Sequence, residues 1–398
     1  MSMAFPNASM SRRGFLVSAC CAAAAPVLTP ASFAAVPGDN RFVTIILRGA
    51  MDGLDLVQPY ADPLFAKLRP RLALTPDQGL IDLDGRFGLH PAASSLMPLW
   101  SAGELSFVHA VSTPYRDERS HFDGQDALET GTLEKGALGK GGRSGWLNRA
   151  LAHMPRQSDR RAIDINTSMD LILAGPNRAE AWAPQSDLAM AEDEIRFLER
   201  LYAGDEGFAK VMAEARDTDL LADAVQGKEK RGEGIADMAR LAAGLLTQEY
   251  RIASFSINGW DTHVDQRPQF ARAVTDLSLA INTLKEGLGP QVWGKTVVLV
   301  ITEFGRTARE NGSGGTDHGT GGAALLAGGG IPGGRILGRW PGLSDDQLLD
   351  GRDLTPTGDV RELAAAMLYR QFDIAPDRLT ADVFPGLSFD KGSGYLRG

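Results

Sequence analysis

Residues 296–306 read TVVLVITEFGR. The first six are apolar or β-branched, which is typical of a strand buried on both faces of a parallel sheet. Polar residues follow at once, among them Glu303 and Arg306. The carboxyl ends of parallel strands share one edge of the sheet, where open α/β proteins bind their ligands. The segment therefore predicts a buried strand whose end carries part of a functional site.

Similar apolar runs occur at 42–47 and 105–111, and weaker ones at 252–257 and 323–326. Helical patterns lie between and after them. They cover 91–101, 121–130, 269–288 and 359–372. Strands that alternate with helices predict an α/β fold with a mostly parallel central sheet sandwiched by helices. The Ala-, Glu- and Arg-rich stretch 186–247 predicts a helical insertion in this domain, either crossover helices or a cap near the site.

Length and composition limit the function classes. The 398 residues suit one large α/β domain or two of ordinary size. With 41 Lys and Arg against 50 Asp and Glu, the net charge is −9, so the basic footprint of a nucleic-acid binder is absent. We therefore expect no nucleic-acid partner.

The N-terminus has the parts of an export signal. Residues 11–16 read SRRGFL, and they precede an apolar stretch at 17–28 and small residues at 31–35. The paired arginines predict a twin-arginine signal over 1–34, which exports folded proteins to the periplasm or beyond. A chance Arg pair and lipidation at Cys20 are the alternatives. No later stretch is apolar for long enough to span a membrane.

The two cysteines, Cys20 and Cys21, lie within this signal. The mature domain, 35–398, then has no thiolate, so His and carboxylate groups must hold any metal. Polar clusters follow the predicted strands at 48–55, 112–123, 258–263 and 302–306, and a glycine-rich cluster occupies 314–322. If they meet at one edge, they predict a site for one or two divalent ions such as Zn²⁺. The predicted ligands are Asp52, Asp261, His263, Glu303 and His318.

Each of these residues also has a simpler interpretation. Asp261 and His263 are two positions apart, which suits either a shared metal or a hydrogen-bonded pair. Ser120 precedes a helical pattern, so it is either a nucleophile at a helix N-terminus or an N-cap. We expect His90, His109 and His153 to have packing roles.

Several motifs together resemble a known family. They are LRGAMDGL at 47–54, RSHFDGQDALETG at 119–131, GWLNR at 145–149, GWDTHVDQ at 259–266, TEFGR at 302–306 and GTDHG at 315–319. In this order behind a twin-arginine signal they resemble a bacterial secreted family, the domain of unknown function DUF1501. That family is similar to the alkaline phosphatase and sulfatase superfamily, which implies a metal-dependent site on an α/β sandwich.

The resemblance also implies roles for individual residues. Ser120 matches the superfamily's nucleophile, and Asp52 its first metal-binding Asp. Asp261, His263 and His318 match the ligands of one metal site. The Asp-His pair after the central strand is Glu303 and Phe304 here. Because Phe304 cannot bind a metal, the second metal site is in doubt, unless His121 or Asp317 compensates.

The expected function is an exported metal-dependent hydrolase of phosphate or sulfate esters. Its expected catalytic residues are Ser120 as nucleophile, His121, and Arg306 or Arg119 to bind the anion. A small anionic ester would then be its partner. The alternative, favoured by Phe304, is a non-catalytic relative that binds or assembles with an envelope protein.

Overall fold

Strand β1 (Arg41–Leu47) lies between β8 (Ile252–Ile257) and β9 (Thr296–Thr302) and is parallel to both. All three strands are buried along almost their whole length, as their apolar sequences predict. The computed structural model describes residues 39–116, 119–132, 144–154, 162–166, 169–182, 234–392 and 394–396. These belong to one compact unit. The predicted signal, 1–34, and residues 186–233 of the predicted insertion lie outside the described residues.

The central sheet has the order β11-β5-β10-β9-β1-β8-β6-β7, with β12 also paired to β5. Its other strands are β5 (Leu105–Ser112), β6 (Ala162–Asp164), β7 (Glu180–Ala181), β10 (Gly322–Ala327), β11 (Arg335–Leu337) and β12 (Gly358–Asp359). Strand β10 runs antiparallel to β5 and β9, whereas the other recorded pairings are parallel. A small antiparallel sheet combines β2 (Val57–Gln58), β4 (Gly88–Leu89) and β3 (Ile81–Asp82).

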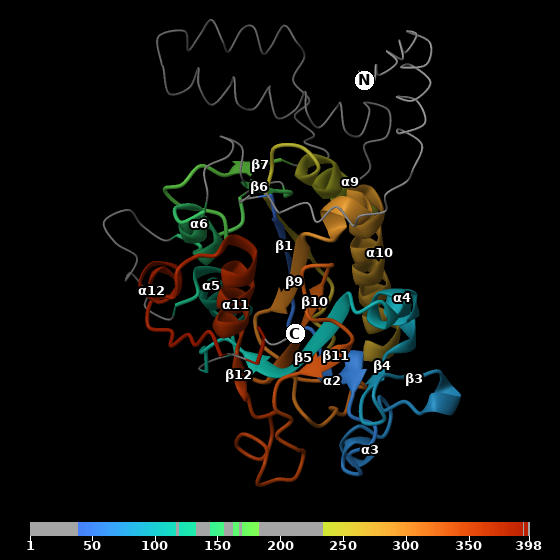
Figure 1. Cartoon of the computed structure of the whole chain (residues 1–398). Coiled ribbons are helices and arrows are strands. Elements are labelled where there is room, and N and C mark those ends of the chain that lie inside the picture. Colours follow the sequence, from blue (N-terminus) through green and yellow to red (C-terminus); the bar gives the residue numbers. More distant parts are fainter. Residues whose placement is uncertain are drawn as a thin grey trace, which may run out of the picture. The chain divides into compact units, whose positions relative to one another are not determined.

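Helices cover both faces of the sheet (Figure 1). One layer contains α4 (Met97–Ser101), α9 (Ile235–Leu246) and α10 (Gln266–Trp293), and the other contains α5 (His121–Thr130), α6 (Trp146–Leu151), α11 (Val360–Phe372) and α12 (Pro376–Arg378). Successive strand residues point to opposite faces. Val43 and Ile45 accordingly pack in one core, and Phe42 and Ile46 in the other.

Shorter helices complete the unit. They are α2 (Gly53–Leu56), α3 (Phe65–Leu68), the 3-10 helices η1 (Pro76–Gln78) and η2 (Pro91–Leu96), and the π-helix η4 (Leu379–Val383). The predicted α/β class is confirmed. The predicted helix over 91–101 is instead η2 followed by α4, with prolines at the start of each. No helix of the described residues is long and apolar enough to cross a bilayer.

The sheet direction places the polar clusters together. Strands β1, β5, β8 and β9 all end at the same edge, which we call the carboxyl edge. Because β10 is antiparallel, the glycine-rich segment that precedes it returns to this edge as well. Four connections therefore meet there: those that follow β1, β5 and β8, and the one between β9 and β10.

Candidate metal centre

Four side chains meet at the carboxyl edge: His121, Asp261, His263 and His318. His121 is the first residue of α5. Asp261 and His263 lie between β8 and α10, and His318 lies between β9 and β10. Three of the five predicted metal ligands therefore come together, and His121 joins them.

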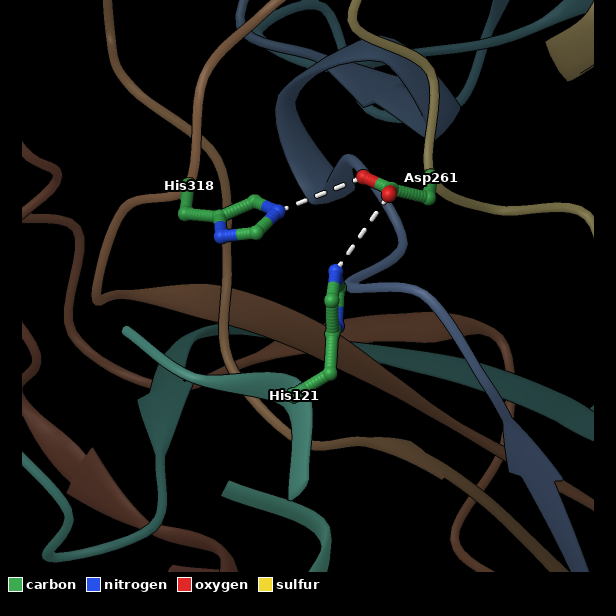
Figure 2. A group of neighbouring side chains, drawn as sticks. All are labelled: His121, Asp261 and His318. Atoms are coloured by element: carbon green, nitrogen blue, oxygen red, sulfur yellow. Dashed lines mark hydrogen bonds and ion pairs between the residues drawn. The ribbon is translucent and has the colours of Figure 1, made fainter. Parts of the chain in front are cut away.

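Asp261 is the common neighbour of the three imidazoles. Its Oδ2 lies 3.4 Å from Nε2 of His121, and its Oδ1 lies 3.0 Å from Nε2 of His263 and 3.3 Å from Nε2 of His318. The Nε2 atoms of His263 and His318 are 3.0 Å apart. Figure 2 shows His121 and His318 approaching the carboxylate from different segments of the chain. The four groups thus point at one small region.

Each imidazole is held through its other nitrogen. Nδ1 of His121 lies 2.8 Å from Glu303 Oε1, and Nδ1 of His318 lies 2.9 Å from the carbonyl oxygen of Arg119. Nδ1 of His263 lies 3.4 Å from Asp317 Oδ1. Carboxylate and carbonyl oxygens only accept hydrogen bonds, so each neutral ring has its proton on Nδ1. This leaves the Nε2 lone pairs for a cation, which is how metal-binding histidines are usually oriented.

The spacing suits a bound ion. A tetrahedral Zn²⁺ with ligands at about 2.0–2.1 Å holds its ligand atoms roughly 3.3 Å apart. The measured separations between Nε2 and carboxylate oxygens are 3.0 to 3.4 Å. In addition, Nε2 of His121 is buried and has no hydrogen-bond partner. His121, Asp261 and His318 therefore fit a divalent metal, with His263 beside them.

Arg306 braces the loops around this centre. Its guanidinium is fully buried, and it has five N–H donors. Its acceptors are the carbonyl oxygens of Gly49, Ala50, Trp260 and Thr316, Oδ1 of Asp261 and Nε2 of His263. No donor is left for a substrate. The expected anion-binding role of Arg306 is thus replaced by a structural one.

The turn after β1 depends on one glycine. Gly49 has φ +116°, which strongly favours glycine, and a Cβ there would lie 2.6 Å from the backbone nitrogen of Asp261. Its amide donates to Glu303 Oε1 at 2.9 Å, while its carbonyl accepts from Arg306. This close approach holds the β1 loop against the segment that carries Asp261.

Glu303 orients a histidine from behind. Its carboxylate is fully buried and accepts from Nδ1 of His121, the amide of Gly49 and, at 2.8 Å, the hydroxyl of Thr302. These contacts occupy both carboxylate oxygens. Glu303, expected as a metal ligand, is therefore placed to orient His121.

Asp52 belongs to a different cluster, which we call the Asp52 network. Its Oδ2 pairs with Arg69 at 2.7 Å and accepts from Gln266 at 2.8 Å. Gln266 also donates to Asp55 at 2.7 Å. Both partners of the Asp52–Arg69 pair are almost fully buried. Asp52, expected as a metal ligand, is therefore neutralised by an arginine and stands apart from the imidazoles.

Ser120 and Phe304 flank His121. Ser120 is the N-cap of α5, with its Oγ accepting from the amide of Asp123 at a long 3.5 Å. Phe304 is buried and stacks on His121, with ring centroids 5.3 Å apart, and it also contacts the ring of His318. The ring of Phe304 therefore packs against the imidazoles of His121 and His318, at the sequence position where the superfamily resemblance implies a metal ligand.

Arg306 and Glu303 shift the pKa values of three candidate ligands. Burial opposes ionisation of Asp261, but the hydrogen bond and charge of Arg306 outweigh it and lower the pKa of Asp261 to about 2. Burial, followed by the charge of Arg306, lowers the pKa of His318. The hydrogen bond to Glu303 raises the pKa of His121. An ionised Asp261 and a neutral His318 are the forms that bind a metal.

Two residues near the centre escaped the sequence reasoning. Arg352 donates to the carbonyl of His318 at 3.0 Å, and it shares Asp353 with Arg119. Arg119 has φ +52°, and its Nε is buried without a partner. Arg352 and Asp353 lie in no motif, so only the fold reveals them.

The other histidines lie elsewhere: His90 caps η2, His109 stacks on Phe87, and His153 pairs with Asp382.

Solved structures that are similar to this chain include a protein in the alkaline phosphatase superfamily from Vibrio parahaemolyticus. It is 13% identical with a TM-score of 0.35, over 76% of this chain and 64% of that one. Another is the lipoteichoic acid synthase LtaP from Listeria monocytogenes, 9% identical with a TM-score of 0.39, over 87% of this chain and 76% of that one. This chain thus spans less than two thirds of the Vibrio protein.

No curated protein matches the chain. The family described as "Protein of unknown function (DUF1501)" matches residues 39–384, nearly the whole described unit. This confirms the family that the motifs resemble. The chain belongs to the DUF1501 family.

Proposed function

We propose that this protein is a metal-dependent hydrolase of phosphate or sulfate esters. One observation carries the proposal: three imidazoles are anchored through Nδ1 and direct Nε2 at one ionised carboxylate. A divalent cation supplies the common partner.

His121, Asp261 and His318 would hold the ion, and His263 lies close enough to complete or vary the set. Zn²⁺, or a similar ion that accepts nitrogen and oxygen ligands, suits these residues. Such an ion would polarise an ester oxygen and stabilise the charge that develops on it. The protein residues around it then need to bind the anion and supply a nucleophile.

Arg119 and Arg352 suit the anion. Both contact His318 or its backbone, and their side chains are 37% and 39% exposed. They share one carboxylate, Asp353. The buried Nε of Arg119 is a donor without an acceptor, and an ester oxygen would satisfy it.

Ser120 is the proposed nucleophile. It lies next to His121 at the start of a ten-residue helix, where backbone N–H groups favour a developing anion. Its hydroxyl is weakly engaged, since the cap contact is 3.5 Å long. Attack by Oγ on phosphorus or sulfur would form a covalent ester and release the alcohol, and water would then free the serine.

Phe304 favours a second function. It fills with an aromatic ring the place where the resemblance implies another metal ligand. A protein with one metal and no turnover would be a binding or assembly protein of the cell envelope. Both functions fit export through the twin-arginine segment that we predict at 1–34.

The test combines metal analysis with an ester panel. We expect about one divalent ion per chain in protein purified from the periplasm, and turnover of aryl phosphates or sulfates. Asp261→Asn should lose the ion and the activity together. His153→Gln, which removes a histidine outside the centre, is the control and should keep both.

Ser120→Ala separates the two functions. A hydrolase that uses Ser120 should retain its metal and lose turnover by at least about a hundredfold. Bound metal without turnover of any ester, in wild type and variant alike, identifies the binding protein. Wild-type protein that binds no divalent metal refutes both.

A further inference from the structure

A pocket beside the small antiparallel sheet shares no residue with the candidate metal centre. Three connections line it: the one between β2 and α3, the one between β3 and β4, and the one between β11 and β12. Its volume is about 320 Å³. Sites for small molecules begin at about this size, so the pocket has room for one small ligand.

Aromatic rings and prolines form the walls of this pocket. Trp340 and Phe87 both line it, with ring centroids 5.4 Å apart and ring planes at 83°. Pro59, Pro63 and Pro341 add apolar surface whose backbone is fixed by the proline ring. The pocket is therefore largely formed before a ligand arrives, which reduces the entropy lost on binding.

A buried histidine holds the two rings in place from behind. The ring of His109 stacks on Phe87 with centroids 4.9 Å apart, and it meets Trp340 edge-on at 5.4 Å. Its Nε2 lies 2.9 Å from the carbonyl oxygen of Val57. Burial lowers the pKa of His109 to about 4, so the imidazole is neutral and donates from Nε2. His109 thus gives the aromatic walls a rigid support.

Four polar groups at the pocket have hydrogen-bonding capacity to spare. The guanidinium of Arg86 and the indole N–H of Trp340 have no hydrogen-bond or ion-pair partner among the described residues. Asp62 uses only Oδ1, which accepts from a backbone amide at 3.0 Å. Gln347 uses only Oε1, which accepts from a neighbouring serine. Several donors and one carboxylate oxygen are therefore available to a ligand.

These groups together limit the class of ligand. Arg86 and Asp62 carry opposite charges, so the pocket favours a ligand without net charge. A purely apolar ligand would desolvate both of them without supplying partners. Proline has no N–H, so a proline-rich peptide would offer Asp62 few donors. A sugar ring has an apolar C–H face that packs on an indole, and its hydroxyls both donate and accept.

We propose that this pocket binds a neutral mono- or disaccharide. One sugar ring packs on Trp340, and its hydroxyls bond to the free groups of Arg86, Asp62 and Gln347. This binding activity goes beyond the proposed hydrolysis. It needs no metal, because no pocket residue belongs to the metal centre.

The experiment is saturation-transfer NMR on the full-length protein, with a chelator present and a panel of neutral hexoses, pentoses and their disaccharides as probes. We expect transfer to the C–H protons of one ring face. Trp340→Ala should weaken binding by at least about tenfold, because it removes the stacking surface. Asp62→Asn should weaken it too. Trp182→Phe alters another half-buried tryptophan, outside the pocket, and should bind like the wild type.

The absence of transfer to every sugar of the panel would overturn the proposal. Equal weakening by Trp340→Ala and Trp182→Phe would do the same, since it would place the sugar elsewhere. A proline-rich peptide that binds where no sugar does would identify a different occupant and refute the sugar. If Trp340→Ala does not fold, Asp62→Asn and Arg86→Gln change side chains at the surface of the pocket. Sugar affinity unchanged in both of these variants would also refute the site.

Discussion

The carboxyl edge holds two polar clusters with opposite characters. In the Asp52 network, each acid is matched by protein donors: Arg69 and Gln266 reach Asp52, and Gln266 and Gln58 reach Asp55. In the candidate metal centre, three Nε2 atoms converge on Asp261. Both clusters follow buried strands in the sequence. The first is satisfied by its own chain, and the second is where we propose that a cation binds.

The largest expected effect concerns the Asp52 network. Arg69→Met leaves Asp52 buried without its counter-charge, and breaking a buried pair costs about 3–5 kcal/mol. Unfolding in urea measures it. Arg71→Met, two residues away, removes an exposed partner of Glu310 and should cost about 0–1 kcal/mol. An equal loss of stability in the two variants would show that the buried Asp52–Arg69 pair stabilises the protein no more than an exposed ion pair does.

Metal removal should have the next largest effect. If the centre holds an ion at 100 to 1,000 times its dissociation constant, chelation lowers the free energy of unfolding by about 2.7–4.1 kcal/mol. Asp261→Asn should be insensitive to the chelator, whereas Asp52→Asn should remain sensitive. If both variants lost the chelator effect equally, Asp52 would support metal binding as much as Asp261 does. That result would contradict the distinction between the two clusters.

Glu303→Gln tests the support behind His121. The amide removes the charge that holds Nδ1 of His121, so metal affinity should fall by about 10–100-fold. Competition with a coloured chelator measures the affinity. Glu129→Gln alters another buried acid that faces Arg48 and should change the affinity much less. An affinity unchanged by Glu303→Gln would remove Glu303 from the site.

The last expected effect is a pH dependence of stability. Burial and the neighbouring Asp52 raise the pKa of Asp55 to about 7, so the folded state retains a proton that the unfolded chain has lost. Stability should therefore fall as pH rises from about 4 to 7, by at most about 1.4 kcal/mol per pH unit. Asp55→Asn should reduce this slope, with the contribution of Asp164, whose pKa burial raises to about 8, remaining. Urea midpoints at pH 5 and 7 measure it, and an unchanged slope contradicts the assignment.

Much of the fold follows from local pattern. Strands β1, β8 and β9 and helix α5 match their predicted ranges within about a residue, because continuous apolar runs and a Ser cap are local signals. The predicted meeting of Asp261, His263 and His318 also follows from the shared edge of a parallel sheet. Short strands such as β6 have no such local sequence pattern, and they form because they pair with neighbouring strands.

The residue types that follow the strands can be read from the amino-acid sequence, and they locate the region where a metal could be held. Which carboxylates remain available to a metal depends on how the folded chain pairs them. Judged from the amino-acid sequence alone, Asp52 and Asp261 are equally plausible metal ligands. Arg69 and Gln266 neutralise the first, and Arg306 binds one oxygen of the second while three imidazoles surround it. Electrostatic pairing acts through space over a few ångströms, so partners up to 214 residues apart in the chain set the role of each acid.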